Sequence, residues 1–257
     1  MIRTGRVELA GLWQSLGIRP GMIVLCHSFL GALGRVEGGT GTVVETLLEA
    51  VGAEGALIAP AFTYSYFKSE IYDPEETAST VGALGDAVRK HPSGLRNLDP
   101  NFSNAAIGRR GHEIIAFDDG ESFGAASPYA KLLAADGHIL LLGVDYTALP
   151  LFMHLEAVNQ VPYRHPKSFS GQSRVAGELK STTVIHHVRD AVSDPQSDRR
   201  RIGVIIDSEA DVRVADLPYG QARLVSARTV ERVVARELAR DALILLDAET
   251  PFRGRRP

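Results

Sequence analysis

The chain has little of what stabilises secreted proteins or anchors membrane proteins. Only one of its 257 residues is a cysteine, Cys26, so no internal disulfide can form. The N-terminal segment MIRTGRVELAGLW lacks the apolar core of a signal peptide. No run of about 18 uninterrupted apolar residues predicts a membrane span. We therefore expect a soluble cytoplasmic protein.

A marked charge excess of either sign is also missing. The formal net charge is −3 and the isoelectric point is near 6.2. Such a balance gives no general attraction to nucleic acid or to an anionic membrane surface. We expect small molecules as partners, and by charge alone a cationic substrate is favoured over a polyanionic one.

The chain does contain enough apolar sequence for a large core. Hydrophobic residues make up 44% of it and charged residues 23%, which predicts one globular domain over 1–250, followed by a tail at 251–257. Apolar runs alternate with helical patterns, which is typical of an α/β layered fold. Strands are predicted at 23–26, 56–59, 138–143 and 202–206, and helices at 8–16, 42–51, 81–90, 130–135 and 229–240.

The most informative stretch runs from Met22 to Tyr64. An apolar strand, IVLCHS, leads into the glycine-punctuated loop FLGALGRVEGGTGT and then into a helix that Thr40 to Thr42 can cap. Backbone N–H groups at such a helix start favour a bound phosphate or carboxylate. A crossover that binds nothing has the same pattern, and neither a Walker loop nor a GxGxxG motif is present.

Two polar segments look like excursions from the core. The segment 64–80 is a candidate lid or substrate wall, and an ordinary surface loop would look the same. The second excursion, 188–201, contains DAVSDPQSDRRR.

A second cluster follows the predicted strand HILLLG. His154 and Glu156 lie two residues apart there, close to Asp145 and Thr147. On a helix the first two would point to different faces, whereas in an extended segment they would share one. A neutral imidazole supported by a carboxylate is suited to removing a proton near neutral pH. A capping or surface histidine remains the alternative.

Six segments along the sequence form an ordered set of motifs. It consists of LCHSFLGALGRVEGG, GAEGALIAPAFTY, TVGALGDAVRKHPSGLRNLDPNFSNAAIG, ASPYAKLLAADGHILLLGV, the histidine cluster and GQARLVSARTVERVVARELARDALILL. In order and spacing this set resembles the aminoglycoside 3-N-acetyltransferase family over residues 7–246. The resemblance implies an α/β/α fold around a central mixed sheet, a single domain with loop excursions. It also implies direct transfer of an acetyl group from acetyl-coenzyme A to a substrate amine.

The resemblance further implies roles for individual residues. Those matched to the coenzyme side are His27, Ser28, Phe29, Leu30, Gly34, Arg96 and Ser103. His154 and Glu156 match the general base and its acid, and Asp190 could serve as the acid instead if its segment folds back over the site. On the acceptor side we expect Tyr64, Asp145, Thr147 and Arg164. The segment after Arg96 departs from the family pattern, because Asn97 replaces a usual serine and Asp99 a usual histidine. This departure leaves the contacts of that segment in question.

The acceptor stays open between an aminoglycoside and a biosynthetic amino sugar. Tyr163, Arg164 and Lys167 in VPYRHPKSFSG would suit an acidic or phosphorylated substrate, such as a nucleotide-linked amino sugar. They would equally suit a solvated turn. The family resemblance implies no metal, and a homodimer would be unsurprising.

Three other functions remain as alternatives. Cys26 beside His27 could act as the nucleophile of an acyltransferase or amidase, although a strand cysteine is usually core. A metal hydrolase would need His27, Asp145, His154 and Glu156, yet no HxxxH or HxH spacing marks a site. A non-catalytic binding role predicts no affinity for acetyl-coenzyme A.

Overall fold

A mixed seven-stranded sheet forms the centre of the computed structural model, which describes residues 2–117, 120–189 and 197–247. The strands are β1 (Arg3–Thr4), β2 (Ile23–Ser28), β3 (Arg35–Val36), β4 (Ala56–Pro60), β5 (Gly94–Arg96), β6 (Asn104–Ile107), β7 (His138–Leu142), β8 (Arg164–Val175), β9 (Glu178–Arg189), β10 (Arg213–Leu217) and β11 (Gly220–Ser226). The central sheet has the order β10-β11-β7-β2-β4-β6-β5. Its middle strand β2 is parallel to both β4 and β7, and the outer pairings are antiparallel.

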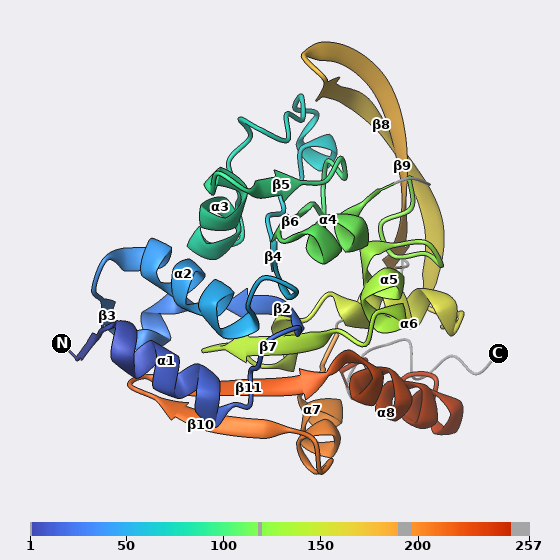
Figure 1. Cartoon of the computed structure of the whole chain (residues 1–257). Helices are drawn as coiled ribbons and strands as arrows, with labels where there is room; N and C mark the ends of the chain where they lie inside the picture. The colour runs from blue at the N-terminus through green and yellow to red at the C-terminus, as the bar shows by residue number, and fades with distance from the viewer. Residues whose placement is uncertain (1, 118–119, 190–196, 248–257) are drawn as a thin grey trace.

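Helices cover both faces of this sheet (Figure 1). The α-helices are α1 (Arg6–Ser15), α2 (Gly39–Val51), α3 (Ala83–Lys90), α4 (Arg109–Ile115), α5 (Pro128–Ala134), α6 (Leu151–Val158), α7 (Arg200–Asp207) and α8 (Ala227–Arg240). The short 3-10 helices are η1 (Leu30–Leu33), η2 (Tyr66–Lys68) and η3 (Tyr146–Ala148).

Alternation along β2 divides the core into two layers. Val24 and Cys26 point into a cluster with α1, α2 and α3, whereas Ile23 and Leu25 point into a cluster with α4 to α8. Both layers exclude water almost completely around β2, whose residues from Ile23 to Cys26 are no more than 2% exposed. The predicted α/β/α fold around a central mixed sheet is confirmed.

Most predicted elements are present, within a few residues of their bounds. The run 202–206 is an exception, because it lies in the helix α7 rather than in a strand. Ile202, Gly203 and Ile206 are buried there while Val204 is 73% exposed, which is the spacing of one helical face. A short apolar run fits a strand or a helix equally well, and here the packing against the core determines that the run is helical.

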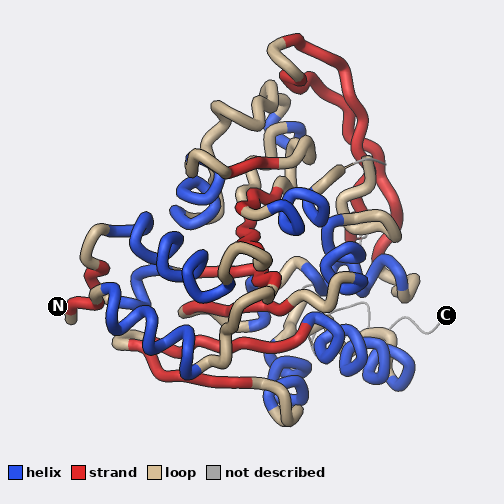
Figure 2. Tube along the Cα trace, in the orientation of Figure 1, coloured by secondary structure: helices blue, strands red, loops and turns tan. Residues whose placement is uncertain are grey.

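A long hairpin of β8 and β9 was not predicted. Its two strands have 12 residues each and curve away from the central sheet, as Figure 2 shows. Most of its residues are exposed, so the hairpin lacks the apolar alternation that marks a half-buried strand. Tyr66 holds it to the body of the protein, since its hydroxyl hydrogen bonds to the Ser173 hydroxyl at 2.7 Å and to that of Thr182.

No described helix combines the length and the hydropathy needed to span a membrane. The predicted tail at 251–257 lies outside the described residues, as do residues 190–196 of the excursion at 188–201.

Candidate active site

A cavity of about 490 Å³ opens beyond the carboxyl ends of the parallel strands β7, β2 and β4. Open α/β sheets bind ligands at this position, because neighbouring crossovers diverge there. Residues from β2, β4, α3, η3 and α6 form its walls. The lining residues are Cys26, His27, Ser28, Phe29, Ala59, Pro60, Phe62, Tyr64, Val81, Leu84, Gly85, Val144, Thr147, Ala148, Pro150, Met153 and Arg199.

Two glycines allow the close packing that shapes this cavity. A Cβ on Gly85 of α3 would lie 2.0 Å from the Pro60 carbonyl oxygen, so α3 can rest on the end of β4 only with glycine there. Gly143 follows β7 with a φ of +72°, and a Cβ there would lie 2.3 Å from that of Ala32. Glycine is therefore needed at both positions for steric reasons.

His27 presents the only imidazole in the described lining. The ring is 5% exposed, and its Nε2 atom has no hydrogen-bond partner among the described residues. Burial lowers the pKa of His27 from 6.5 to about 3, because a charged ring would lose its hydration. A neutral imidazole therefore lies at the end of β2 and can still form one hydrogen bond with a ligand.

His154 lies beside the cavity rather than in its lining. The residue belongs to α6 and is 4% exposed, and its Nδ1 donates to the Phe123 carbonyl oxygen at 3.0 Å. The Ser127 hydroxyl lies 3.4 Å from the same nitrogen. Burial lowers the pKa of His154, and the Phe123 carbonyl opposes that shift. From α6 it is the preceding residue, Met153, that lines the cavity.

Glu156 is fully buried in an ion cluster away from His154. Its Oε2 lies 2.6 Å from Arg164 Nε and 3.9 Å from Arg199 Nη2, and Tyr163 donates its hydroxyl hydrogen to Oε1 at 3.0 Å. Since 151–158 is helical, the interpretation in which Glu156 and His154 share a face is wrong. Arg164, predicted to contact the acceptor, is likewise directed to Glu156.

Arg199 enters the lining from a segment that sequence reasoning treated as an excursion. Its side chain is directed to η3, where Nη1 donates to the Leu149 carbonyl oxygen at 2.9 Å. The guanidinium carbon lies 4.9 Å from the centre of the Phe152 ring. Asp190, the other acid considered for His154, lies outside the described residues. A run of three arginines gave no signal that the first would be buried, because charge runs are usually solvated.

Arg96 and Ser103, both predicted on the coenzyme side, contact each other behind the wall of the cavity. Arg96 Nε donates to Ser103 Oγ at 2.9 Å, and its other nitrogens donate to the carbonyl oxygens of Ala61 and Thr77. Ala61 lies between the lining residues Pro60 and Phe62. Neither Arg96 nor Ser103 lines the cavity, and both support its wall from behind, so their contact with the coenzyme stays a prediction.

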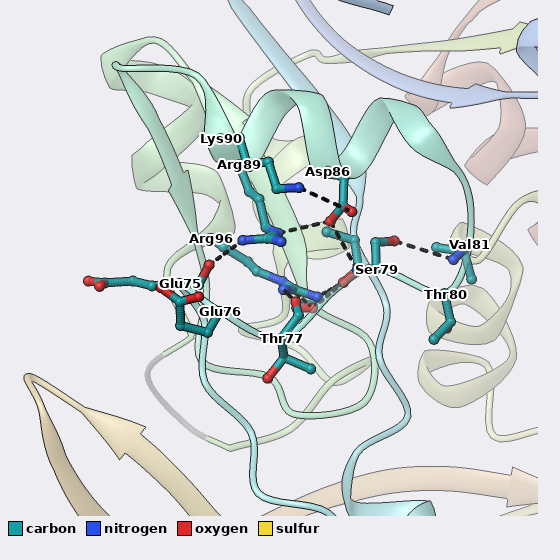
Figure 3. A network of polar contacts seen from close by, with 12 residues as sticks. Glu75, Glu76, Thr77, Ser79, Thr80, Val81, Asp86, Arg89, Lys90 and Arg96 are labelled. Atoms are coloured by element: carbon teal, nitrogen blue, oxygen red, sulfur yellow. Dashed lines mark hydrogen bonds and ion pairs between the residues drawn. The ribbon is translucent and has the colours of Figure 1, made fainter.

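A polar network around Asp86 of α3 holds the segment from Ser79 to Val81, which precedes this helix (Figure 3). Asp86 of α3 accepts from the Ser79 N–H at 3.0 Å and from Arg89 Nε at 2.9 Å, while the Val81 N–H donates to Ser79 Oγ at 3.3 Å. Val81 lines the cavity. The predicted substrate wall 64–80 thus reaches the cavity at its beginning, through Tyr64, and Val81, the residue that follows it, reaches the cavity as well.

The glycine-rich loop divides into two parts. His27, Ser28 and Phe29 line the cavity, and Phe29 is 61% exposed. Leu30 and Gly34 do not, and a Cβ on Gly34 would lie 2.6 Å from the Ile2 carbonyl oxygen. The helix α2 begins at Gly39 after the left-handed Gly38, so the predicted threonine cap is wrong.

On the acceptor side, Tyr64 and Thr147 line the cavity. Tyr64 has a φ of +56°, an uncommon conformation for a non-glycine residue, and burial raises the pKa of its hydroxyl. Asp145 is exposed, and its Oδ1 accepts from the Thr147 N–H at 2.8 Å. That carboxylate therefore organises η3.

The alternatives involving a thiol or a metal find little support in the geometry. Cys26 is fully buried, and burial raises the pKa of its thiol, so the nucleophilic thiolate is disfavoured. Within residues 2–117, 120–189 and 197–247, no group of three or more His, Cys, Asp and Glu side chains could hold a metal ion.

Comparison with known proteins places these features in a family context. A family model described as aminoglycoside 3-N-acetyltransferase matches residues 25–239. The aminoglycoside N(3)-acetyltransferase IX of Micromonospora chalcea is 31% identical over 183 residues, which cover 61% of this chain and 65% of that protein. The aligned segment thus spans slightly less than two thirds of that relative.

Solved structures are similar over nearly the whole chain. AAC-VIa with bound sisomicin has a TM-score of 0.82 at 25% identity, covering 93% of this chain and 99% of that one. AAC-IIIb in a binary complex with CoASH has a TM-score of 0.81 at 21% identity, covering 93% and 97%. The second likeness concerns the fold alone.

Proposed function

Because this chain belongs to the aminoglycoside 3-N-acetyltransferase family, we propose that it transfers an acetyl group from acetyl-coenzyme A to an amine of an amino sugar. The observation that carries this proposal is the cavity at the carboxyl ends of β7, β2 and β4. Its lining includes His27, Ser28 and Phe29, which the sequence assigned to the coenzyme side. Aminoglycosides are one candidate class of acceptor, and nucleotide-linked amino sugars are another.

The lining suits the arm of coenzyme A that carries the thioester. Phe29, Phe62, Leu84 and Met153 offer apolar surface, while Ser28 ends β2 beside them. Ligand sites of this kind combine apolar walls with a few polar groups that fix orientation. A pantetheine arm needs both, because its methylene and methyl groups alternate with amides.

His27 is the side chain that we assign to the reacting groups. The attacking amine forms a C–N bond with the acetyl carbon as the C–S bond breaks, the amine loses a proton, and the departing thiolate takes one up. A neutral His27 Nε2 can form a hydrogen bond to the amine or to the thioester oxygen at this stage. A low pKa keeps the ring neutral at physiological pH.

The proposal is tested by incubating the purified full-length chain with acetyl-coenzyme A and a panel of amines. The panel contains sisomicin, glucosamine, glucosamine 6-phosphate and a nucleotide-linked amino sugar. Free thiol is measured colorimetrically, and the acetylated amine is identified by mass spectrometry. Reactions without an amine measure thioester hydrolysis and serve as the control.

We expect thiol release that depends on the amine, with one acetylated product for each thiol. The absence of amine-dependent thiol release across the panel, together with no calorimetric binding of coenzyme A, would contradict the proposal. It would favour a non-catalytic role instead.

A further inference from the structure

Arg199 is the only charged side chain in the described lining of the cavity, and no carboxylate lines it there. It lies 7% exposed at the N-cap of α7. Asp145, although close in sequence to the lining residue Thr147, is directed to the backbone of η3. The site is expected to receive amines, which are positively charged when protonated. The charged group in its wall is also positive, so it would repel such an amine rather than attract it.

Among the residues that the structure describes, the positive charge of Arg199 is only partly compensated. Two arginines share the Glu156 carboxylate, and Arg164 takes the closer position at 2.6 Å against 3.9 Å for Arg199. Arg199 Nη1 donates to the carbonyl oxygens of Leu149 and Thr147, which are dipoles rather than charges. A buried charge is normally paired, because its desolvation costs several kcal/mol otherwise.

The hydrogen-bonding capacity of Arg199 is also unfilled. Among the described residues its Nε has no acceptor, although the atom is buried. An arginine fork binds the two oxygens of a carboxylate or phosphate through neighbouring N–H groups. A ligand oxygen in the cavity would supply both the missing acceptor and the missing charge.

We propose that Arg199 binds a carboxylate or phosphate group of the ligand that occupies the cavity. This inference rests on the proposed acetyl transfer and adds the chemistry of a group that the ligand carries. The anion belongs either to the acceptor, which is then an amine with an acidic group, or to the phosphates of coenzyme A. It replaces Arg164 and Lys167 as the residues expected to bind an acidic group.

The first experiment compares two acceptors that differ only by a phosphate, glucosamine and glucosamine 6-phosphate. Binding is measured by calorimetry, so no turnover is needed, and kcat/KM is measured in parallel. A charge-assisted contact of this kind changes affinity by about 10- to 100-fold. We expect the wild-type protein to prefer the phosphorylated amine by that factor, and Arg199→Gln to lose the preference.

The second experiment distinguishes the coenzyme as the source of the anion. Coenzyme A and pantetheine share the thiol arm, but only the former carries phosphates. If Arg199→Gln lowers the affinity for coenzyme A about 10-fold or more and leaves pantetheine unchanged, the anion is that of the coenzyme. If it changes only the acceptor preference, the anion is that of the acceptor.

Two further variants separate charge recognition from folding. Arg199→Lys retains the charge without the fork and should keep part of the preference. Arg201→Gln removes an exposed arginine from the same helix and should keep all of it. Thermal unfolding identifies any variant that has lost its fold. If Arg199→Gln does not fold, the phosphate preference of Arg199→Lys is compared with that of the wild type and decides the question.

The inference is overturned if the folded Arg199 variants bind both ligand pairs with the wild-type preference. It is also overturned if wild type shows no preference for the phosphate in either pair. Loss of acetyl transfer with an intact anion preference would instead contradict the proposed function and leave the anion site standing.

Discussion

Two histidines that lie in different environments define the chemistry at the residue scale. His27 lies next to the last residue of β2 and lines the cavity, and its buried Nε2 has no hydrogen-bond partner among the described residues. His154 donates its Nδ1 hydrogen to the Phe123 carbonyl oxygen and is not among the residues that line the cavity. The family resemblance assigned the proton chemistry to His154, and that role stays a prediction. Our proposed function gives contact with the reacting groups to His27 instead, because His27 lines the cavity.

A matched pair of substitutions decides between them. We expect His27→Asn to lower kcat by about 10²- to 10³-fold, the range typical of losing one positioned hydrogen-bonding group in the transition state. We expect His154→Asn to lower the melting temperature, because α6 loses its bond to Phe123, and to change kcat much less. Steady-state kinetics with thermal unfolding of both variants measures this, and the reverse order of effects would return the role of base to His154.

At the scale of elements, the cavity depends on how closely α3 rests on β4. Gly85 provides that closeness, and the Ser79–Asp86–Arg89 network ties the preceding segment to the same helix. Arg96 adds a second connection, from β5 to the carbonyl oxygens of Ala61 and Thr77. The wall formed by 60–62 and Val81 is therefore held from behind by polar contacts.

Replacing Gly85 tests this dependence. The Cβ of Gly85→Ala would meet the Pro60 carbonyl oxygen at 2.0 Å, so α3 must move away from β4. We expect a loss of about 1–3 kcal/mol in the free energy of unfolding and weaker binding of coenzyme A. Urea unfolding and calorimetry measure the two effects.

Gly11→Ala is the matched control for this substitution. Gly11 lies exposed in α1, and a Cβ there meets nothing within 4 Å. We expect this change to stabilise the protein by up to about 1 kcal/mol, since alanine favours the helix. If Gly85→Ala behaved like Gly11→Ala, the contact between α3 and β4 would not shape the cavity.

At the scale of the whole molecule, burial of several imidazoles links stability to pH. Burial lowers the pKa of His27 to about 3 and that of His186 to about 4, and it also lowers those of His138 and His154. The unfolded chain binds protons near pH 6.5, where these folded rings do not. Their contribution to stability is therefore complete above that pH and is lost as the pH falls toward 4.

We expect the free energy of unfolding to fall between pH 6.5 and 4. Each such histidine contributes a slope of up to about 1.4 kcal/mol per pH unit. Asp99 opposes the trend, since burial raises the pKa of its carboxyl, but it is one group against four. Urea unfolding across this range measures the slope.

His186→Gln should flatten that dependence, whereas His165→Gln, which changes an exposed ring, should not. A wild-type stability that stays constant down to pH 4 would show that these rings are accessible to protons in the folded state.

The sequence by itself determined which segments alternate as strands and helices, because apolar periodicity is local. It also placed His27, Ser28 and Phe29 at the end of a buried strand. Only the tertiary structure decided which side chains meet. Each residue along α6 turns by about 100°, so Met153 faces the cavity and His154 does not. Arg199 reaches the cavity from a distant segment through packing of α7 that no local pattern records.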